Sequence, residues 1–366
     1  MIVRPTLLLD SRRVERNIET MARKVQGEAV RWRPHMKTHQ SAQIAELFRH
    51  RGVEAITVSS LSMAKYFADH GWRDILVAFP VNLLERELLV ELASCVHLGL
   101  LVDSPLPLSP LASSLESPVD LWIKIDVGYR RAGLSWDDEK GVLSLAEEIM
   151  QRPCFRFRGF LTHGGQTYSA GSPERIREIF RENLDRMNSL KRAFSLRFPR
   201  VGVEISVGDT PGCRLAEGWR GVDEVRPGNF VFYDLQQLSL GVCSQEEIAL
   251  TVACPVVSLY PGRSQWLLCG GAGHRSEETF LDAQGRRLYG WVVPLREDGW
   301  GRVEEGGAPL SLSQEHGLFE LTPPLAASLR AGGLAAVLPA HSCLAVSALG
   351  AYQTLDGRAV ERLREA

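Results

Sequence analysis

The amino-acid sequence predicts an α/β protein in which a closed parallel (β/α)8 TIM barrel is followed by a mainly β C-terminal domain. Three observations favour this fold. Short apolar runs alternate with helical patterns, glycine-rich polar segments follow several of these runs, and helical patterns nearly vanish beyond residue 240. An open doubly wound sheet is the rival architecture, but no Gly-x-Gly-x-x-Gly motif follows the first run.

Eight short apolar or β-branched runs are the candidate strands of the barrel. Runs of this kind are expected of parallel strands that are buried on both faces. In chain order they are Val30–Arg33, Ala55–Val58, Ile75–Ala78, His97–Val102, Leu121–Ile125, Phe157–Thr162, Glu204–Val207 and Asp223–Val225. The barrel domain is therefore predicted to span residues 8–240.

Helical patterns separate these strands. A first helix is expected to begin at Asp10 or Ser11, either of which can cap it, and to end near Val25. The later candidates are Ser41–Arg49, Ser62–Asp69, Leu84–Ser94, Asp138–Gln151 and Pro173–Ser195. After the fourth barrel strand, three prolines between residues 105 and 110 leave room for only a short helix.

Residues 241–366 are predicted to form the second, mainly β domain, because short strand-like runs broken by Gly, Pro and Asp dominate there. These runs are Ile248–Val257, Trp266–Cys269, Leu288–Val293, Ala335–Leu338 and Cys343–Val346. The N-terminal strand, residues 1–7, is assigned to this domain, with a position covering the barrel as the alternative.

The composition excludes several classes of partner. Among 366 residues, 42 lysines and arginines face 44 acidic residues, and the net charge of −2 gives no support for nucleic-acid or anionic-membrane binding. No apolar stretch has the length of a signal peptide or a transmembrane helix. The seven cysteines are scattered without a Cys-x-x-Cys pair, so we expect reduced thiols and a cytoplasmic location.

The segment Arg33–Gln40 reads Arg-Pro-His-Met-Lys-Thr-His-Gln and directly follows the first candidate strand. Active sites of (β/α)8 barrels lie at the C-terminal ends of the strands. An unprotonated lysine there can form a Schiff base with a carbonyl, such as that of pyridoxal 5'-phosphate (PLP). By itself Lys37 is more simply interpreted as a solvated surface residue, and the catalytic interpretation depends on the other loops.

Four further strand ends carry unusual residues. The segments are Asp126–Gly133, Thr162–Tyr168, Val207–Pro211 and Arg226–Asn229. In the last two, glycines precede expected helix starts, where backbone N–H groups can bind phosphate. A single such glycine is more simply a turn residue, but two at this corner of a barrel favour a phosphate site.

A different chemistry is indicated by His341-Ser-Cys343. If this segment is a strand, its first and third side chains share one face and can hold a Zn²⁺ with open positions. The alternative is a buried cysteine beside a structural histidine, which is the commoner arrangement.

Taken together and in this order, the motifs resemble one family. They are Pro-His-x-Lys-Thr-His, Asp-x-Gly-x-x-Arg-x-Gly, Thr-His-Gly-Gly, Gly-x-Thr-Pro, Arg-Pro-Gly-Asn-x-Val-Phe-Tyr-Asp, Ser-Gln-Glu-His-Gly and a late His-x-Cys. From Thr6 to Thr354 the chain resembles the fold-type III PLP enzymes of the D-serine dehydratase and D-threonine aldolase family, which are related to alanine racemase. The resemblance implies a PLP-binding barrel, a β domain, a small D-amino acid as substrate, and a homodimer.

The resemblance also assigns site residues. Lys37 corresponds to the catalytic Schiff-base lysine. Arg131 corresponds to the arginine near the phenolic oxygen of PLP, and Tyr168 to a ring contact; His163 and Gly208 are further cofactor-binding positions. Thr210, Gly228 and Asn229 correspond to the phosphate contacts, and His341 and Cys343 to the ligands of a zinc ion, with manganese as the alternative metal.

The implied reaction is the dehydration of a D-β-hydroxy amino acid to a 2-oxo acid and ammonia. The aldolases of the family carry an aspartate where Cys343 stands, so retro-aldol cleavage is the alternative; a racemase and a non-catalytic PLP-binding protein are further alternatives. Four departures from the family pattern make the substrate less predictable than the cofactor. They are Gln40 for a lysine, Gln166 for a histidine, Asp209 for a serine, and the segment Cys269–Ser276 for an Asp-x-Gly start.

Overall fold

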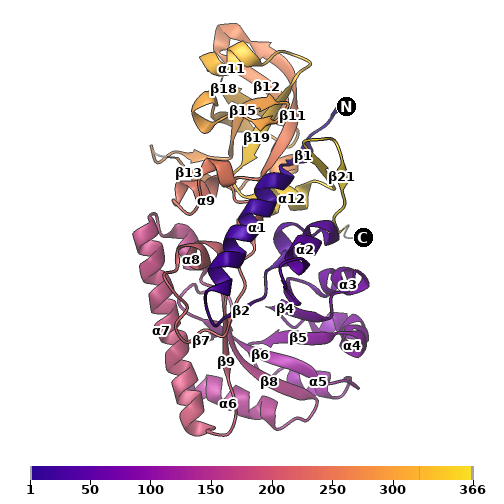
Figure 1. Cartoon of the computed structure of the whole chain (residues 1–366), viewed down its shortest axis with the longest axis vertical. Helices are drawn as coiled ribbons and strands as arrows, with labels where there is room; N and C mark the ends of the chain where they lie inside the picture. Colours follow the sequence, from indigo (N-terminus) through magenta and orange to yellow (C-terminus); the bar gives the residue numbers. More distant parts are fainter. Residues whose placement is uncertain (1, 283, 321, 364–366) are drawn as a thin grey trace. The chain divides into compact units, whose positions relative to one another are not determined.

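The computed structural model describes residues 2–282, 284–320 and 322–363, which divide into two compact units (Figure 1). The barrel unit comprises Met21–Gly228. The β unit combines the chain up to Thr20 with the chain from Asn229 onward. The boundary between the units thus follows Gly228, whereas the sequence analysis placed a domain boundary at residue 240.

In the barrel unit, parallel strands follow one another in the order β2-β10-β9-β8-β6-β5-β4-β3. Their bounds are β2 (Arg31–Trp32), β3 (Ala55–Val58), β4 (Asp74–Pro80), β5 (His97–Val102), β6 (Val119–Asp126), β8 (Phe155–Thr162), β9 (Glu204–Val207) and β10 (Glu224–Val225). A short β7 (Leu134–Ser135) pairs with β6. An isolated parallel bridge between His35 and Thr57 joins the two ends of the sheet, so the barrel is nearly closed and the predicted fold is confirmed.

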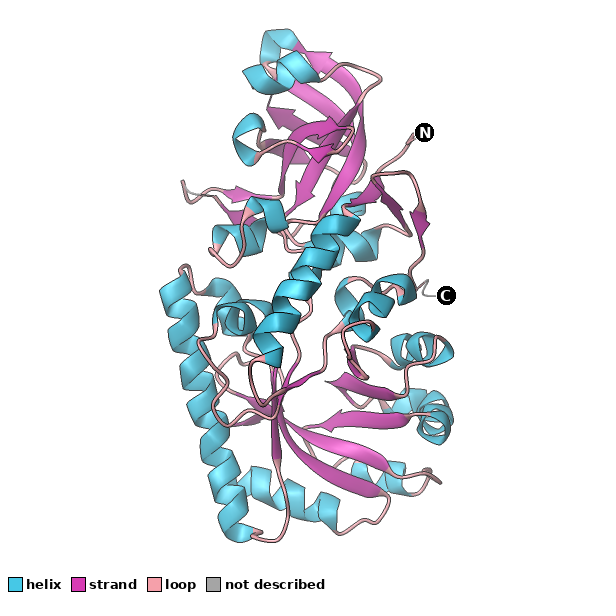
Figure 2. Ribbon diagram, in the orientation of Figure 1, coloured by secondary structure: helices cyan, strands magenta, loops and turns pink. Residues whose placement is uncertain are grey.

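Helices alternate with these strands, as Figure 2 shows. They are α1 (Ser11–Gln26), α2 (Ala42–Arg49), α3 (Leu61–Asp69), α4 (Arg86–Cys95), α5 (Leu108–Ala112), α6 (Glu139–Met150), α7 (Pro173–Arg197) and α8 (Thr210–Leu215). Six of them begin at side chains that accept a hydrogen bond from the first turn: Asp10, Ser41, Ser60, Asp138, Ser172 and Asp209. The expected short helix after the fourth strand is α5. No helix in the described part of the chain is long and apolar enough to cross a membrane.

The inside of the barrel unit is apolar. Leu76, Leu101, Trp122 and Leu161 form a cluster whose members are each at most 2% exposed. They come from β4, β5, β6 and β8, so the interior is filled by side chains from successive strands. A packed barrel of this kind has no channel, and its chemistry must lie at the strand ends.

Charged side chains from seven of the eight barrel strands form a ring, which we call the charge ring. Most members lie at the first residues of their strands, the end opposite to the loops that carry Lys37 and Thr210. The members are Arg31, Arg33, Asp74, His97, Asp120, Arg156, Arg158, Glu204 and Glu224. Its most buried link joins Arg33 Nε to Glu224 Oε2 at 2.6 Å, and the Glu224 side chain is 0% exposed.

The β unit is a sheet in the order β16-β15-β19-β11-β1-β20-β21, with β12, β17 and β18 attached through β11. Its strands are β1 (Thr6–Leu9), β11 (Leu250–Tyr260), β12 (Gln265–Cys269), β13 (Phe280–Leu281), β14 (Arg287–Leu288), β15 (Gly290–Arg296), β16 (Gly299–Trp300), β17 (Pro309–Leu312), β18 (His316–Glu320), β19 (Leu334–Pro339), β20 (Tyr352–Thr354) and β21 (Ala359–Val360). Since β1 pairs with β11 and β20, the N-terminal strand belongs to this unit rather than covering the barrel.

Short helices α9 (Leu235–Ser239), α10 (Ala272–Arg275), α11 (Pro323–Ser328) and α12 (Ser342–Ala348) complete the β unit. The prediction of a strand at Cys343–Val346 is wrong, because this run forms α12. A short apolar run does not distinguish a buried strand from a helix. The helix is selected by tertiary context: Asp234 Oδ2 accepts a hydrogen bond from the first helical amide, Ser342 N, at 2.9 Å.

Candidate active site

Lys37 lies in a single 3-10 turn, η1 (Met36–Thr38), that directly follows the first barrel strand, and its side chain is exposed. His35 begins this turn: its Nδ1 accepts a hydrogen bond from Lys37 N at 3.3 Å. The turn is also tied to its neighbours in the barrel, because His35 N donates to Pro227 O at 3.0 Å. Burial, with the nearby charge of Lys37, holds the pKa of His35 well below its ordinary value, so this acceptor stays neutral.

The second histidine of the motif is structural. His39 is completely buried; its Nδ1 accepts from Ser41 N at 3.1 Å, and its ring stacks on Phe48 with centroids 5.9 Å apart. Burial lowers the pKa of His39 to about 3. His39 therefore supports the start of α2 and is not available for proton transfer.

The loops after β6 and β8 bring aromatic rings together. The His163 ring meets Tyr129 edge to face at 6.1 Å and lies 6.2 Å from the ring of Tyr168. The guanidinium of Arg131 lies over the Tyr129 ring at 5.2 Å. His163 Nδ1 donates to Gly208 O at 2.6 Å, and burial lowers the pKa of His163, which leaves its neutral Nε2 as an acceptor.

Thr210 stands at the predicted phosphate corner, at the start of α8. Its Oγ1 is buried and has no hydrogen-bond partner among the described residues. The two predicted glycines of this corner allow close approaches of backbone: a Cβ on Gly228 would lie 2.8 Å from His35 O, and one on Gly208 would lie 3.0 Å from Arg226 O. The corner is therefore small, close to the Lys37 turn, and provided with an unsatisfied hydroxyl.

The α8 amides are less available to a phosphate than the sequence suggested. Thr210 N donates to the Tyr168 hydroxyl at 3.4 Å, Pro211 has no N–H, and Gly212 N donates to Asp209 Oδ1 at 2.5 Å. Asp209 also accepts from Thr167 Oγ1 at 2.9 Å, and burial raises its pKa to about 6. The unexpected aspartate thus caps α8.

Asn229 opens the β unit with a 3-10 turn, η4 (Asn229–Val231), instead of the expected α-helix. Its Nδ2 donates to Asp234 Oδ2 at 2.8 Å and to Ser342 Oγ at 2.9 Å. Both protons of the side-chain amide are thereby used within the β unit. The predicted phosphate contact of Asn229 is consequently limited to its backbone.

The predicted metal ligands lie at the start of α12. His341 is the residue before the helix, and Cys343 lies in its first turn. His341 Nδ1 is 3.3 Å from Asp234 Oδ2, and although burial alone lowers the pKa of His341, Cys343 and Asp234 raise it well above its ordinary value. No group of three or more His, Cys, Asp or Glu in the described ranges is arranged to hold a metal, so a metal here would need water or substrate as further ligands.

The other departures have structural explanations. Gln40 adopts a left-handed conformation, with φ of 51°. Its Nε2 donates to Lys37 O at 3.2 Å, which closes the turn that carries Lys37. Gln166 Nε2 donates to Asn183 Oδ1 at 2.8 Å. In the segment Cys269–Ser276, the buried Arg275 donates to Gly270 O at 3.0 Å and packs over an aromatic ring, so this segment is held within the β unit.

The sequence analysis missed two buried groups. Lys124, on β6, is 6% exposed, and burial together with Arg226 and Arg131 lowers its pKa to about 7. The available signal was a lysine inside an otherwise apolar strand. Asp234 was part of a quoted motif but had no role, because nothing in the sequence places it beside His341.

The residues present fit PLP and a divalent metal. The barrel unit offers an exposed amine at Lys37, a guanidinium at Arg131, ring faces at His163 and Tyr168, and the orphaned hydroxyl of Thr210. The β unit offers an imidazole and a thiol in one helical turn, a donor set of the kind that zinc prefers.

Comparison with known proteins identifies two families. Residues 9–236 match "Alanine racemase, N-terminal domain", and residues 249–355 match "Putative serine dehydratase domain". A D-threo-3-hydroxyaspartate dehydratase of Delftia sp. (strain HT23) is 30% identical, with 96% of this chain and 93% of the relative covered. A D-serine dehydratase of Schizosaccharomyces pombe is 28% identical over 96% of this chain and 88% of its own.

A D-threonine aldolase of Arthrobacter sp is 26% identical over 63% of this chain and 61% of its own. Among solved structures, a histidine-to-alanine mutant of a D-threo-3-hydroxyaspartate dehydratase superposes with a TM-score of 0.91 at 28% identity, covering 100% of this chain and 96% of the other. A cysteine-to-alanine mutant in the metal-free form gives 0.91 and 28%, covering 100% and 99%. The chain therefore belongs to the D-serine dehydratase and D-threonine aldolase family of PLP-dependent, alanine racemase-like proteins.

Proposed function

We propose that the protein is a PLP- and zinc-dependent lyase that dehydrates a D-β-hydroxy amino acid to a 2-oxo acid and ammonia. The observation that carries this proposal is the Cys343 thiol two residues after His341, in the first turn of α12, at the position where the resemblance gives the family's aldolases a carboxylate. A soft thiolate selects Zn²⁺, whereas a carboxylate suits Mg²⁺, Ca²⁺ or Mn²⁺. Zinc is a strong Lewis acid for a departing hydroxide, and elimination depends on that polarisation.

In the barrel unit, Lys37 is proposed to anchor PLP and to remove the Cα proton of the substrate as an unprotonated amine. PLP, when bound, takes up the electron pair left at Cα. Arg131 would hold the phenolic oxygen, Tyr168 and His163 would contact the ring, and Thr210 Oγ1 would donate to the phosphate. Gly208 and Gly228 would leave room for the phosphate, and Asn229 would contribute its backbone N–H.

In the β unit, His341 and Cys343 would hold the metal, whose chemistry is to polarise the β-hydroxyl. The printed descriptions of two relatives support this assignment. In those mutants of D-threo-3-hydroxyaspartate dehydratase, the replaced histidine and cysteine lie two positions apart, as do His341 and Cys343, and the cysteine mutant is a metal-free form. Loss of water then gives an enamine, which takes up water to yield the 2-oxo acid and ammonia.

Retro-aldol cleavage is the second candidate, because one relative is a D-threonine aldolase. It needs a base for the proton of the β-hydroxyl rather than a polarised leaving group. The carbon skeleton of the products separates the two reactions.

Product analysis on purified, PLP-loaded protein tests the proposal. We expect pyruvate from D-serine, 2-oxobutanoate from D-threonine and oxaloacetate from D-threo-3-hydroxyaspartate, each with one ammonia. A strong chelator should abolish these products and Zn²⁺ should restore them, while the PLP absorbance stays unchanged. The L-enantiomers serve as controls. Glycine as the main product, with acetaldehyde from D-threonine or glyoxylate from D-threo-3-hydroxyaspartate, would show retro-aldol cleavage and contradict the proposed dehydration. Full activity in the presence of the chelator would contradict the proposed role of the metal.

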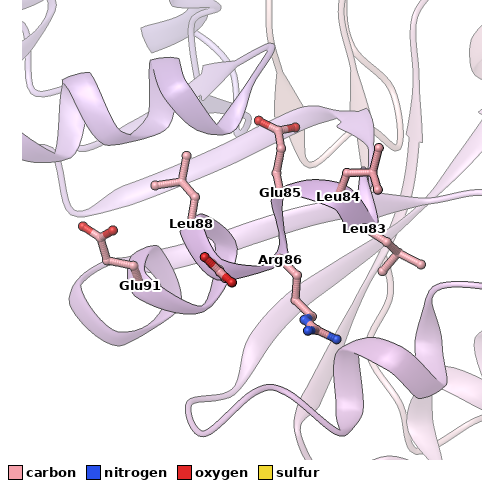
Figure 3. Close-up of a pocket in the computed structure, with 7 residues that line it drawn as sticks. Leu83, Leu84, Glu85, Arg86, Leu88 and Glu91 are labelled. Carbon is pink, nitrogen blue, oxygen red and sulfur yellow. The ribbon is translucent and has the colours of Figure 1, made fainter.

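We also propose that the protein works as a homodimer. The end of β4 and the turn that follows it expose apolar side chains that a monomer would leave in water: Phe79, on β4, is 61% exposed, and Leu84 is 95% exposed. Figure 3 shows Leu83 and Leu84, on η2 (Leu83–Glu85), extending from the ribbon beside the charged Arg86. A second copy of the chain is the proposed partner of this surface.

Light scattering after gel filtration is expected to give twice the chain mass, and the double change of Phe79 and Leu84 to aspartate should shift it toward the monomer. The same changes at Leu196 and Val201, which are also exposed but lie at and beyond the end of α7, should leave the mass unchanged. A monomeric natural protein at micromolar concentration would contradict the proposal.

A further inference from the structure

Asp234 is a buried carboxylate of the β unit that lies beside the proposed metal pair, His341 and Cys343. Its side chain is 0% exposed. Oδ1 accepts from Gln237 N at 3.0 Å, which fixes the start of α9. Oδ2 accepts from Ser342 N at 2.9 Å and from Asn229 Nδ2 at 2.8 Å. A buried carboxylate with so many fixed donors cannot turn, and its position is set before any ligand arrives.

This fixed carboxylate faces the imidazole of His341. Nδ1 of His341 lies 3.3 Å from Asp234 Oδ2. The alignment falls short of a hydrogen bond, so Nδ1 has no hydrogen-bond partner among the described residues, but the nearby negative charge still favours the imidazole form whose proton is on Nδ1. The other ring nitrogen, Nε2, is then the one with a lone pair for a metal. Histidines that bind metals in proteins are commonly oriented in this way.

Asn229 and Ser342 hold the carboxylate from the other side. Asn229 Nδ2 donates to Asp234 Oδ2 and to Ser342 Oγ, and it also lies 3.8 Å from Cys343 Sγ. Ser342 is the residue between His341 and Cys343, so the same cluster fixes the backbone from which both proposed ligands project. The side chain of Asn229 is thus part of the support for α12 rather than a phosphate contact.

We propose that Asp234 is the positioning residue of the metal pair: its carboxylate selects the His341 form that presents Nε2 and, with Asn229, fixes the first turn of α12. The inference rests on the proposed function, because it requires that His341 and Cys343 hold a metal. It assigns to two residues of the Arg-Pro-Gly-Asn-x-Val-Phe-Tyr-Asp motif a role toward the metal instead of the cofactor phosphate.

The test is a Co²⁺ titration of PLP-loaded, metal-stripped protein, followed by the thiolate-to-cobalt charge-transfer absorbance and by competition with a chelator. Asp234→Asn is the first variant, because an amide N–H facing His341 would favour the opposite tautomer and block Nε2. We expect its Co²⁺ affinity to fall by about 10- to 100-fold, the size typical for loss of a ligand's carboxylate partner. The charge-transfer band at saturation and the PLP absorbance should persist.

Asp282→Asn is the matched control, because it makes the same change at another carboxylate of the β unit, on the loop between β13 and β14, that accepts from Gln284 N at 3.0 Å and from Arg286 N at 2.8 Å. Its Co²⁺ affinity should stay within about threefold of the natural protein, since the carboxylate beside His341 is kept. Asn229→Ala is a second test variant for the case that Asp234→Asn does not fold. It loosens the carboxylate and should weaken Co²⁺ binding several-fold.

The outcomes separate this inference from the proposed function. If the natural protein shows no charge-transfer band that depends on His341, the proposed metal role is wrong and this inference falls with it. If the natural protein binds Co²⁺ through His341 and Cys343 but Asp234→Asn and Asn229→Ala bind it equally well, only the positioning role is overturned. An equal loss of affinity in Asp282→Asn would reduce Asp234 to a general structural role.

Discussion

Replacing Lys37 with alanine should reduce turnover of the D-β-hydroxy substrate by at least about 10³- to 10⁴-fold. The change removes the amine that anchors PLP and the base that takes the Cα proton, and no neighbouring residue supplies both functions. Some PLP should still bind through Arg131 and Thr210. The measurement is 2-oxo acid formation from D-serine in PLP-saturated protein.

The matched comparison is Lys124, the other amine at this end of the barrel. Burial lowers the pKa of Lys124 to about 7, so a fraction of the Lys124 amines is unprotonated near neutral pH. Borohydride reduction of the natural protein should bleach the imine absorbance, and peptide mapping should find the label on Lys37 alone. A label on Lys124, or substantial turnover by Lys37→Ala, would refute the assignment.

The largest loss of stability is expected from Glu224→Gln in the charge ring. Glu224 is completely buried and accepts from Arg33 Nε at 2.6 Å and Arg31 Nε at 3.0 Å. Removing one partner of a fully buried ion pair costs about 3–5 kcal/mol. Here Arg33 keeps its contact with Asp74 Oδ1 at 2.6 Å, so we expect a loss toward the lower end of that range. The free energy of unfolding from urea denaturation measures it. Glu178→Gln, which breaks the exposed pair with Arg175, should leave the free energy of unfolding nearly unchanged.

The same carboxylate predicts a pH dependence. Burial alone would raise the pKa of Glu224, but the guanidinium groups of Arg33 and Arg31 outweigh it, so the pKa is lowered from 4.5. Because the folded value lies below the unfolded one, the stabilisation is complete above pH 4.5 and is lost as the pH falls toward the folded value. The stability difference between the natural protein and Glu224→Gln should therefore shrink on acidification. A constant difference would contradict this.

The barrel was predictable because its strands are local signals. Each run is short and mostly apolar, and all eight predicted runs agree with the strand ends to within two residues at both ends. Ala55–Val58, His97–Val102 and Glu204–Val207 are exact matches in their bounds. The N-terminal strand was ambiguous because its partners, β11 and β20, lie more than 200 residues away.

The candidate site was predictable in composition but not in its contacts. Lys37 and Thr210 were identified because each follows a predicted barrel strand, and His341 because it forms a His-x-Cys pair with Cys343. The sequence could not show that the amide of Asn229 donates to Asp234, because that pairing is created by tertiary packing. For the same reason it did not reveal that Cys343 lies on a helix, where a hydrogen bond from Ser342 N to Asp234 stabilises the backbone conformation.

The charge ring has a consequence for how this scaffold can evolve. The ring stabilises the end of the barrel that carries none of the predicted site residues, while Gln40, Gln166 and Asp209 replace expected residues at the opposite end. The residues that stabilise the barrel and the residues that vary from the family pattern thus lie at opposite ends of the same strands. A lineage can exchange rim residues and acquire new substrates without spending the stability reserve on which further mutations depend.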